Sequence, residues 1–147
     1  MILYLKTQKM QELWMYDSIF DLWNDEKKKL NRSNKIVHPK PREIWYIKIW
    51  VNVWRELFGK SWFFRPVLVV SIIGNMYFCI PLTTKWRNTE YYIKIHSVVF
   101  NRNSFVVISQ WRIFDSQRFF ARMGILSKQE FRYIKKLLRL KYFPEDS

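Results

Sequence analysis

Glycine is scarce in this chain of 147 residues, which has three where an average usage of roughly 7% gives about ten. So few glycines are unusual in a strand-rich protein, because tight turns need positive φ angles that glycine adopts at little cost. Cysteine occurs once, at Cys79, which excludes an internal disulfide framework and fits a reducing compartment. We therefore expect a cytoplasmic protein.

Histidine and long apolar runs are also few. His38 and His96 lie too far apart for metal-ligand spacing, and we expect no bound metal and no cofactor. The longest apolar run, Val67–Ile73, has the length of a strand and falls short of the roughly 20 residues that span a bilayer. Met1–Leu5 is apolar, but lysine and glutamine follow at once, so it lacks the form of a secretory signal. We expect no membrane partner.

Positively charged side chains are abundant in this sequence. The 26 Lys and Arg residues against 12 Asp and Glu give a formal net charge of +14 at pH 7. Such a field favours phosphate-rich partners, of which nucleic acids are the first to consider. The length suffices for one compact domain with a short extension and is too short for two ordinary domains.

Residues 1–41 are predicted to form an N-terminal helical extension and a linker. Asp17 or Ser18 can cap a helix whose apolar positions recur at helical spacing as far as Leu30. This helix either packs on the domain, which is the commoner case, or docks on a partner. Residues 31–41 contain Asn, Ser and two prolines, as is typical of a linker. The domain proper is then expected over residues 42–147.

From residue 42 the hydrophobic period becomes that of strands. Gly74-Asn75 is a two-residue hairpin signal, and Ser127 with Glu130 forms a capping-box pattern that opens a terminal helix. We expect an α+β protein, mainly β, in which hairpin-joined strands form a small barrel and the terminal helix packs across it. The predicted strands are Glu43–Ile49, Pro66–Ile73, Met76–Ile80, Tyr91–Ile95, Ser104–Gln110, Arg112–Phe114 and Phe119–Met123.

Groups that bind phosphate recur at the ends of these strands. Arg65 precedes Pro66 and a buried strand, and its guanidinium offers paired donors that stay charged at any relevant pH. Thr83 offers a hydroxyl, and Glu56 is the nearby loop carboxylate that can accept a proton. Taken singly, each is more often an ordinary surface or strand-end residue. The other candidates for contacts to phosphate or bases are Thr84, Lys85, Ser109, Gln110 and Arg112.

This set of groups suits the cleavage of RNA without a metal. The 2′-hydroxyl must lose a proton and attack the neighbouring phosphorus, and the 5′-oxygen must leave protonated. A base, a cationic or hydrogen-bonding clamp for the phosphorane and an acid therefore suffice. Only RNA carries this internal nucleophile.

Four segments follow one another along the strand-rich part of the chain: Glu43-Ile44-Trp45, Arg65–Val70, Pro81–Lys85 and Ser109–Asp115. In this order they are similar to a G-E-I-W strand, an R-P-V-L-V-V strand, a P-x-T-T segment and a Q-x-R-x-x-D stretch. The chain therefore resembles the MazF/PemK family of toxin endoribonucleases, which has these four segments. The likeness covers roughly residues 42–143, which is most of the chain.

The resemblance implies an SH3-like barrel, a homodimer that binds single-stranded RNA along the dimer groove, and a cognate antitoxin that blocks this groove. It implies an endoribonuclease of a type II toxin–antitoxin system that leaves 2′,3′-cyclic phosphate and 5′-hydroxyl ends. Arg65 would stabilise the phosphorane, Thr83 would position the phosphate, and Glu56 would be the base. The RNA contacts would come from Thr84, Lys85, Ser109, Gln110 and Arg112.

The loop around Glu56 departs from the family's G-x-E-Q-x-G pattern. Trp54 replaces the first glycine and Leu57 replaces the glutamine. This departure favours an alternative, a catalytically inactive small-barrel nucleic-acid-binding protein of the same fold. A third interpretation is a peripheral membrane protein bound through its N-terminal helix, but the acidic residues of that helix are unlike a basic membrane-binding face.

Several tryptophans stand in loops or at strand ends where glycine is expected. Trp50, Trp54, Trp86 and Trp111 are of this kind, and Trp62 is similar. Together with the shortage of glycine, they suggest the hypothesis that the source reads UGA as glycine. The alternative is a divergent toxin with native tryptophans. The codons decide between the two, because UGG at these positions excludes the hypothesis.

Overall fold

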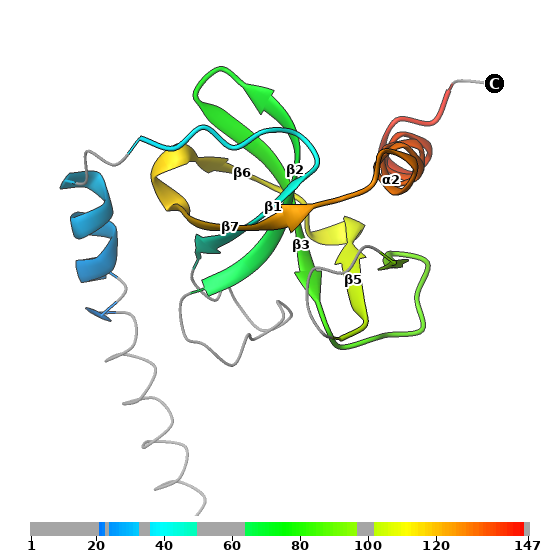
Figure 1. Ribbon diagram of the computed structural model, residues 1–147, viewed down its shortest axis with the longest axis horizontal. Coiled ribbons are helices and arrows are strands. Elements are labelled where there is room, and N and C mark those ends of the chain that lie inside the picture. Colours follow the sequence, from blue (N-terminus) through cyan, green and yellow to red (C-terminus); the bar gives the residue numbers. More distant parts are fainter. Residues whose placement is uncertain (1–20, 23, 33–35, 50–63, 97–101, 146–147) are drawn as a thin grey trace, which may run out of the picture. The chain divides into compact units, whose positions relative to one another are not determined.

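The computed structural model describes residues 21–22, 24–32, 36–49, 64–96 and 102–145 (Figure 1). The chain divides into two compact units, Met1–Lys35 and Ile36–Ser147. A domain boundary after residue 41 stays a prediction. No helix in the described ranges is both long and apolar enough to cross a membrane.

The first unit contributes a helix over residues 21–22 and 24–32, where the sequence predicts one. Ion pairs link its successive turns, from Lys28 to Asp25 at 3.5 Å and from Lys29 to Glu26 at 3.0 Å. The predicted cap at residue 17 or 18 lies outside the described residues. The two predicted roles of the helix, packing on the domain or docking on a partner, stay predictions.

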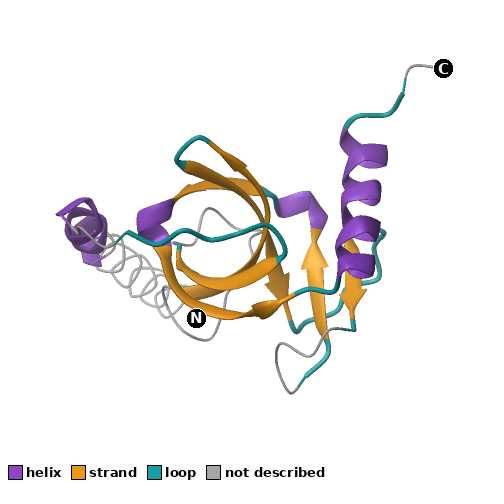
Figure 2. Ribbon diagram, turned by 45° about the horizontal axis from the view of Figure 1, so that its top comes forward, coloured by secondary structure: helices purple, strands orange, loops and turns teal. Residues whose placement is uncertain are grey.

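The second unit is a seven-stranded antiparallel sheet followed by a helix. Figure 2 shows the curved strands with this helix to one side of them. Along the sheet the strands follow the order β4-β5-β3-β2-β1-β7, and β6 pairs with β3. The predicted mainly β fold with a terminal helix is confirmed, but the sheet is curved rather than closed, since no ladder among the described residues joins its edges. The elements are β1 Glu43–Lys48, β2 Phe64–Ile73, β3 Met76–Thr83, β4 Tyr92–Ile95, β5 Ser104–Val107, η1 Ile108–Gln110, β6 Arg112–Asp115, η2 Ser116–Arg118, β7 Phe119–Ile125 and α2 Lys128–Tyr142, where η1 and η2 are 3₁₀ turns.

Strand β3 runs three residues beyond its predicted end at Ile80. Its first half pairs with β6, ending at Cys79, and its last two residues, Leu82 and Thr83, pair with β5. Pro81 lies where the partner strand changes. A proline lacks the N–H that a ladder needs, so it fits this gap between two partners. The predicted end at Ile80 was therefore too early, because the strand continues through Pro81.

Other strand bounds differ from prediction in ways that affect the candidate residues. Strand β2 begins at Phe64, so Arg65 lies within it rather than before it. The predicted strand over 104–110 ends at Val107 and continues as η1. Bulges in the β1–β7 and β2–β3 ladders add local twist, which supports the curvature of the sheet.

Alternate residues of the strands enter two different hydrophobic clusters. On β2, Val67 and Val69 belong to the inner cluster, which the curved sheet encloses, and Leu68 belongs to the outer cluster beneath α2. The outer cluster includes Ile134 and Leu138 of the helix. The buried members of the inner cluster are Ile47, Val67, Val69, Tyr77, Cys79, Phe114 and Phe119.

Glu43 at the start of β1 carries a buried carboxylate that accepts three hydrogen bonds. Its Oε2 accepts from the backbone N–H of Lys40 at 2.9 Å and from the indole N–H of Trp45 at 2.8 Å. Its Oε1 accepts from Nε of Arg122 on β7 at 2.9 Å. Burial alone raises the pKa of Glu43, but these hydrogen bonds and the Arg122 charge outweigh it and hold the pKa below its ordinary value. Glu43 thereby fixes the pairing of β1 with β7.

Arg42 has a φ of 75°, and it is the only described non-glycine residue with a positive φ. Its guanidinium donates to the carbonyl of Leu126 from Nε at 3.1 Å and from Nη2 at 2.9 Å. Backbone hydrogen bonds also join Arg42 to Val69 and Leu126. These contacts offset the cost of a left-handed conformation, which the family's pattern meets with glycine at this position.

Helix α2 is fixed to the sheet at both ends. Ser127 Oγ accepts from the N–H of Glu130 at 3.2 Å and donates to its Oε2 at 2.9 Å, which confirms the predicted capping box. Glu130 Oε1 also accepts from the backbone N–H of His96 after β4. At the other end, the Tyr142 hydroxyl donates to the carbonyl of Ile108 in η1 at 3.0 Å.

Candidate active site

Arg65 and Gln110, two of the predicted site residues, meet in the structure. Nη2 of Arg65 on β2 donates to Oε1 of Gln110 in η1 at 3.3 Å, across 45 positions of sequence. Arg65 is 8% exposed, so its guanidinium is held within the protein rather than solvated at the surface. A buried charged group needs hydrogen-bonding partners, and its orientation is correspondingly restricted.

Thr83 lies on the same face of the sheet as Arg65. The β2–β3 ladder pairs Val67 with Pro81, and two residues further along each strand stand Arg65 and Thr83. Because side chains alternate between faces, both residues are directed to the side of the inner cluster. Thr83 Oγ1 accepts from the backbone N–H of Lys85 at 3.1 Å, and a hydroxyl that accepts in this way still has its own proton to donate.

The remaining predicted contacts lie on β6, in the turn after β3 and in η1. Arg112 pairs with Cys79 and shares a side of β6 with Phe114 of the inner cluster, so it is directed to the same side as Arg65 and Thr83. Thr84 and Lys85 are exposed in the turn after β3, and Ser109 is exposed in η1. Glu56 lies outside the described residues, so its predicted role as base stays a prediction.

The structure adds a cation that the sequence did not single out. Arg118 ends η2, and its Nη1 donates to the backbone carbonyl of Lys48 at 3.3 Å. Burial lowers the pKa of Arg118, the charge of nearby Arg112 lowers it further, and Asp115 opposes both effects. An arginine stays charged under such shifts, so Arg112 and Arg118 form a region of concentrated positive potential. The sequence shows Arg118 six positions after Arg112, but nothing in the sequence alone indicates that the two lie close together. The turn η2 brings them together.

The arrangement is chemically suited to an oxyanion. Arg65 supplies a fixed guanidinium, Thr83 supplies a hydroxyl, and Arg112 with Arg118 adds positive potential. Charge-assisted hydrogen bonds from such groups are strongest on phosphate oxygens. A separate open hollow between β4 and the start of α2, lined by Lys94, His96, Gln129, Glu130 and Tyr133 among others, contains none of the predicted site residues.

Residues 40–142, more than half of the chain, match the family described as PemK-like, MazF-like toxin of type II toxin-antitoxin system. The chain belongs to this family. The family expected from the four sequence segments is thereby confirmed. No curated protein sequence matches this toxin-family chain.

Several solved structures have a fold similar to that of this chain. The MazE–MazF structure from Deinococcus radiodurans has a TM-score of 0.56 at 12% identity and covers 73% of this chain and 97% of that chain. An endoribonuclease from mycobacterial species has a TM-score of 0.56 at 11% identity, covering 76% and 98%. The Mycobacterium tuberculosis toxin MazF-mt6 has a TM-score of 0.53 at 15% identity, covering 67% and 93%. At these identities the likeness shows the fold.

Two of the unusual tryptophans of this MazF-like chain fall within the described residues. Trp111 has φ −60° and ψ 145°, which any residue adopts, so its backbone does not require glycine. Its ring stacks on Phe78 with centroids 5.0 Å apart and meets the edge of Tyr142 at 6.1 Å. Trp86 is 60% exposed in the loop after β3. Trp111 therefore has a packing role, whereas Trp86 has none of comparable extent.

Proposed function

We propose that this MazF-like toxin is an endoribonuclease that cleaves single-stranded RNA without a metal, as part of a type II toxin–antitoxin system. The observation that carries the proposal is the buried Arg65, held by Gln110 and directed to the same side of the sheet as Thr83. A fixed guanidinium beside a hydroxyl suits a phosphate that gains negative charge during reaction. The family match supports the same conclusion.

In the proposed reaction the 2′-oxygen of RNA bonds to the neighbouring phosphorus as its proton passes to a base. Glu56 is proposed as that base. Arg65 stabilises the additional negative charge of the phosphorane, and Thr83 donates a hydrogen bond that orients the phosphate. The bond from phosphorus to the 5′-oxygen then breaks as that oxygen takes a proton, for which Arg65 is the proposed donor. The products are a 2′,3′-cyclic phosphate and a 5′-hydroxyl end.

The proposal includes two protein partners, a second copy of the chain and a cognate antitoxin. RNA would bind along the dimer groove through Thr84, Lys85, Ser109, Gln110 and Arg112, and the antitoxin would block this groove. The solved MazE–MazF structure and the structure of an endoribonuclease from mycobacterial species in complex with its cognate antitoxin support an antitoxin partner. The formal net charge of +14 supports a polyanionic substrate.

The test is incubation of the purified protein with a long single-stranded RNA in excess EDTA. We expect discrete fragments with 5′-hydroxyl ends, and a rate lower by about 10²–10³ in Arg65→Ala, as for the loss of one transition-state donor. Arg102→Ala, which removes an exposed arginine of the same unit, should cleave at the wild-type rate. Unchanged cleavage by Arg65→Ala would contradict the proposed role of Arg65.

A second candidate is a catalytically inactive RNA- or DNA-binding protein of the same fold. Trp54 and Leu57 in the loop around Glu56 favour it, because the family's pattern has glycine and glutamine there. In the same experiment this protein would retard the RNA in a gel and leave it intact. Intact, retarded RNA therefore excludes the nuclease and supports the binding protein.

A further inference from the structure

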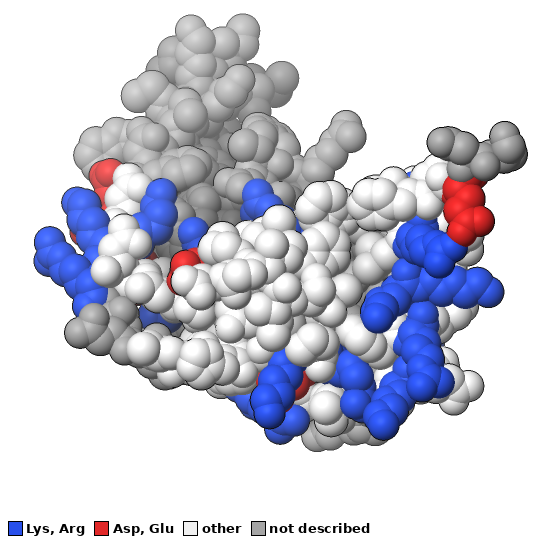
Figure 3. All heavy atoms as spheres, turned by 90° about the horizontal axis from the view of Figure 1, so that it is seen from above, with Lys and Arg blue, Asp and Glu red and all other residues white. Residues whose placement is uncertain are grey.

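Five basic residues form a stripe along α2, and we call them the basic stripe: Lys128, Arg132, Lys135, Lys136 and Arg139. All five are exposed. Their spacing at intervals of three or four residues places them on one side of the helix, over an axial length of roughly 16 Å. Figure 3 shows the resulting run of Lys and Arg side chains over α2.

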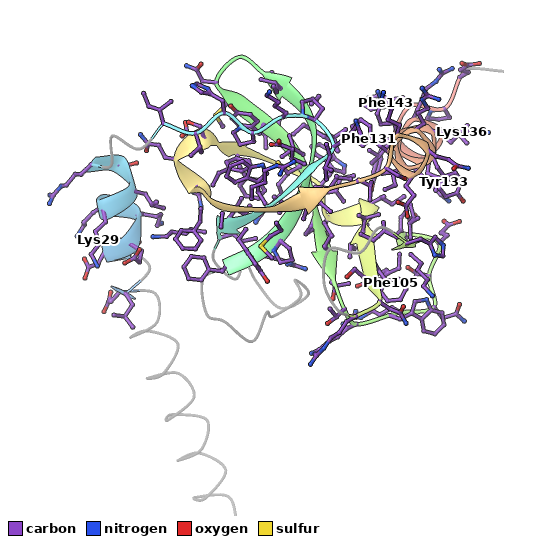
Figure 4. The ribbon with its side chains drawn as sticks, viewed as in Figure 1. Lys29, Phe105, Phe131, Tyr133, Lys136 and Phe143 are labelled. Atoms are coloured by element: carbon purple, nitrogen blue, oxygen red, sulfur yellow. The ribbon has the colours of Figure 1, made fainter. Side chains whose placement is uncertain are left out.

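The basic stripe is separate from the side of the helix that packs on the sheet. Phe131, Ile134 and Leu138 are buried against the outer cluster. In Figure 4, Phe131 lies on the sheet side of α2, and Lys136 lies on the opposite side. Hydrophobic packing therefore accounts for the buried side of α2 and leaves the basic stripe without a role in the core.

The charge of the basic stripe is only partly offset. Arg139 forms an ion pair with Glu145, and Lys135 lies over the ring of Phe131 at 5.3 Å. Glu130 is the one acidic residue of α2, and its carboxylate accepts from Ser127 Oγ and from the N–H of His96. A row of like charges opposes helix stability, so its presence favours an anionic partner.

The C-terminal end of α2 adjoins the candidate active site. Tyr142 donates from its hydroxyl to the carbonyl of Ile108 in η1, and its ring meets the edge of Trp111. Gln110, which holds Arg65, is the last residue of η1. The turn η1 thus links the candidate site, on the inner side of the sheet, to the end of α2, on the outer side, and a polyanion that passes around η1 can follow the basic stripe.

We propose that the basic stripe is a second RNA-binding surface, outside the cleavage site, that contacts the backbone of the RNA beyond the scissile phosphate. The inference rests on the proposed function, since it takes single-stranded RNA as the substrate. A phosphate backbone is bound by a linear series of cations with no requirement for sequence. The stripe itself consists of Lys and Arg alone, and an acidic peptide, which would also have the exposed Tyr133 and Leu140 of α2 within reach, is a separate outcome of the test below.

The experiment measures binding of 2′-O-methyl oligonucleotides, which lack the free 2′-hydroxyl and are not cleaved. Fluorescence anisotropy compares a strand of about six nucleotides, chosen to occupy the cleavage site alone, with one of about 24, chosen to be long enough to extend along α2 as well. The test variant is Arg132→Gln/Lys136→Gln. The matched control is Lys27→Gln/Lys28→Gln, which removes two exposed lysines from the helix of the first unit.

For the long strand, the slope of log K against log salt should be about 1.4 smaller in magnitude in the test variant than in the wild type. Each phosphate contact to a single strand contributes about 0.7 to this slope, and the variant loses two. At about 0.1 M salt this corresponds to binding weaker by roughly 25-fold. Affinity for the short strand and its cleavage as unmodified RNA should stay at the wild-type level. The control should match the wild type throughout.

Other outcomes overturn the inference. If the wild type cleaves RNA but the test variant binds the long strand like the control, the basic stripe has no RNA function and the nuclease proposal stands. Equal losses in the test and control variants would indicate an effect of net charge alone. A wild type that neither binds nor cleaves RNA overturns both proposals. An acidic antitoxin peptide that requires the stripe, while RNA does not, assigns the surface to a protein partner.

Discussion

Replacing Glu43 by glutamine should destabilise the fold substantially, although the two side chains have nearly the same shape. Glutamine retains one acceptor oxygen and presents an NH₂ group in place of the other. If its oxygen faces Lys40 and Trp45, the NH₂ group opposes the Nε–H of Arg122. The charged hydrogen bond to Arg122 is then lost, at a cost of about 1.5–3 kcal/mol, and the other two bonds weaken. We expect a total loss of about 3 kcal/mol and a fall in Tm of roughly 10 °C.

The effect should depend on pH with a definite sign. The folded-state pKa of Glu43 lies below the ordinary value of 4.5, so its stabilisation is fully present above that value and is lost as the pH falls through the folded-state pKa. Protonated Glu43 resembles glutamine, so the Tm difference between wild type and Glu43→Gln should shrink as the pH is lowered from neutral into the acid range.

The assay is thermal unfolding followed by near-UV circular dichroism at a series of pH values. Glu90→Gln is the matched control, because Glu90 pairs with Lys141 at 2.5 Å but its side chain is 62% exposed. Exposed ion pairs contribute about 0–1 kcal/mol, so this variant should hardly change Tm. The reasoning is refuted if both variants unfold at the same temperature, or if the Tm difference for Glu43→Gln is independent of pH.

Three further changes test other parts of the structure. Arg42→Gly should lower the free energy of unfolding by about 1 kcal/mol, because the loss of two charged hydrogen bonds outweighs the relief of the left-handed backbone strain. Arg42→Ala should lower it more, because alanine keeps that strain. Urea denaturation measures both variants, and a glycine variant more stable than the wild type would contradict this account. Burial raises the pKa of the Cys79 thiol above its ordinary range, so it should react with a disulfide reagent only after unfolding, and rapid labelling of native protein would exclude this burial. Trp111→Gly should cost about 1–3 kcal/mol through the lost contacts to Phe78 and Tyr142, whereas an unchanged Tm would favour glycine as the native residue.

The features that the sequence predicted well are those determined by residues close together in the chain. The capping box of Ser127 and Glu130 and the Gly74-Asn75 hairpin are each set within a few positions, and both are present. The predicted start of β2 at Pro66 and the predicted end of β3 at Ile80 were misplaced, and in each case a proline lies within the strand. The tolerance of a strand for proline depends on which neighbour lies alongside it, and that is a property of the sheet.

The candidate site was predicted as a set of residues but not as an arrangement. Nothing local relates Arg65 to Gln110, because the strands between them decide where η1 lies. Alternation along paired strands then explains why Thr83 and Arg112 share the side of Arg65. Arg118 was not predicted as a site residue for the same reason. Its position near Arg112 depends on the turn η2, which follows β6 and leads into β7.

The pairing of β3 with three strands has a consequence for the substrate. Thr83 belongs to β3, Arg65 to the strand paired along one of its edges, and Arg112 to a strand paired along the other. These residues therefore share one rigid frame and have little freedom to adjust to what they bind. Under the proposed function the adjustment falls to the RNA, which must bring its 2′-oxygen into line with the bond that breaks. A flexible single strand loses modest conformational entropy in doing so, whereas a duplex must first lose its base pairs, so on this proposal the stiffness of the sheet would itself discriminate between the two forms of RNA.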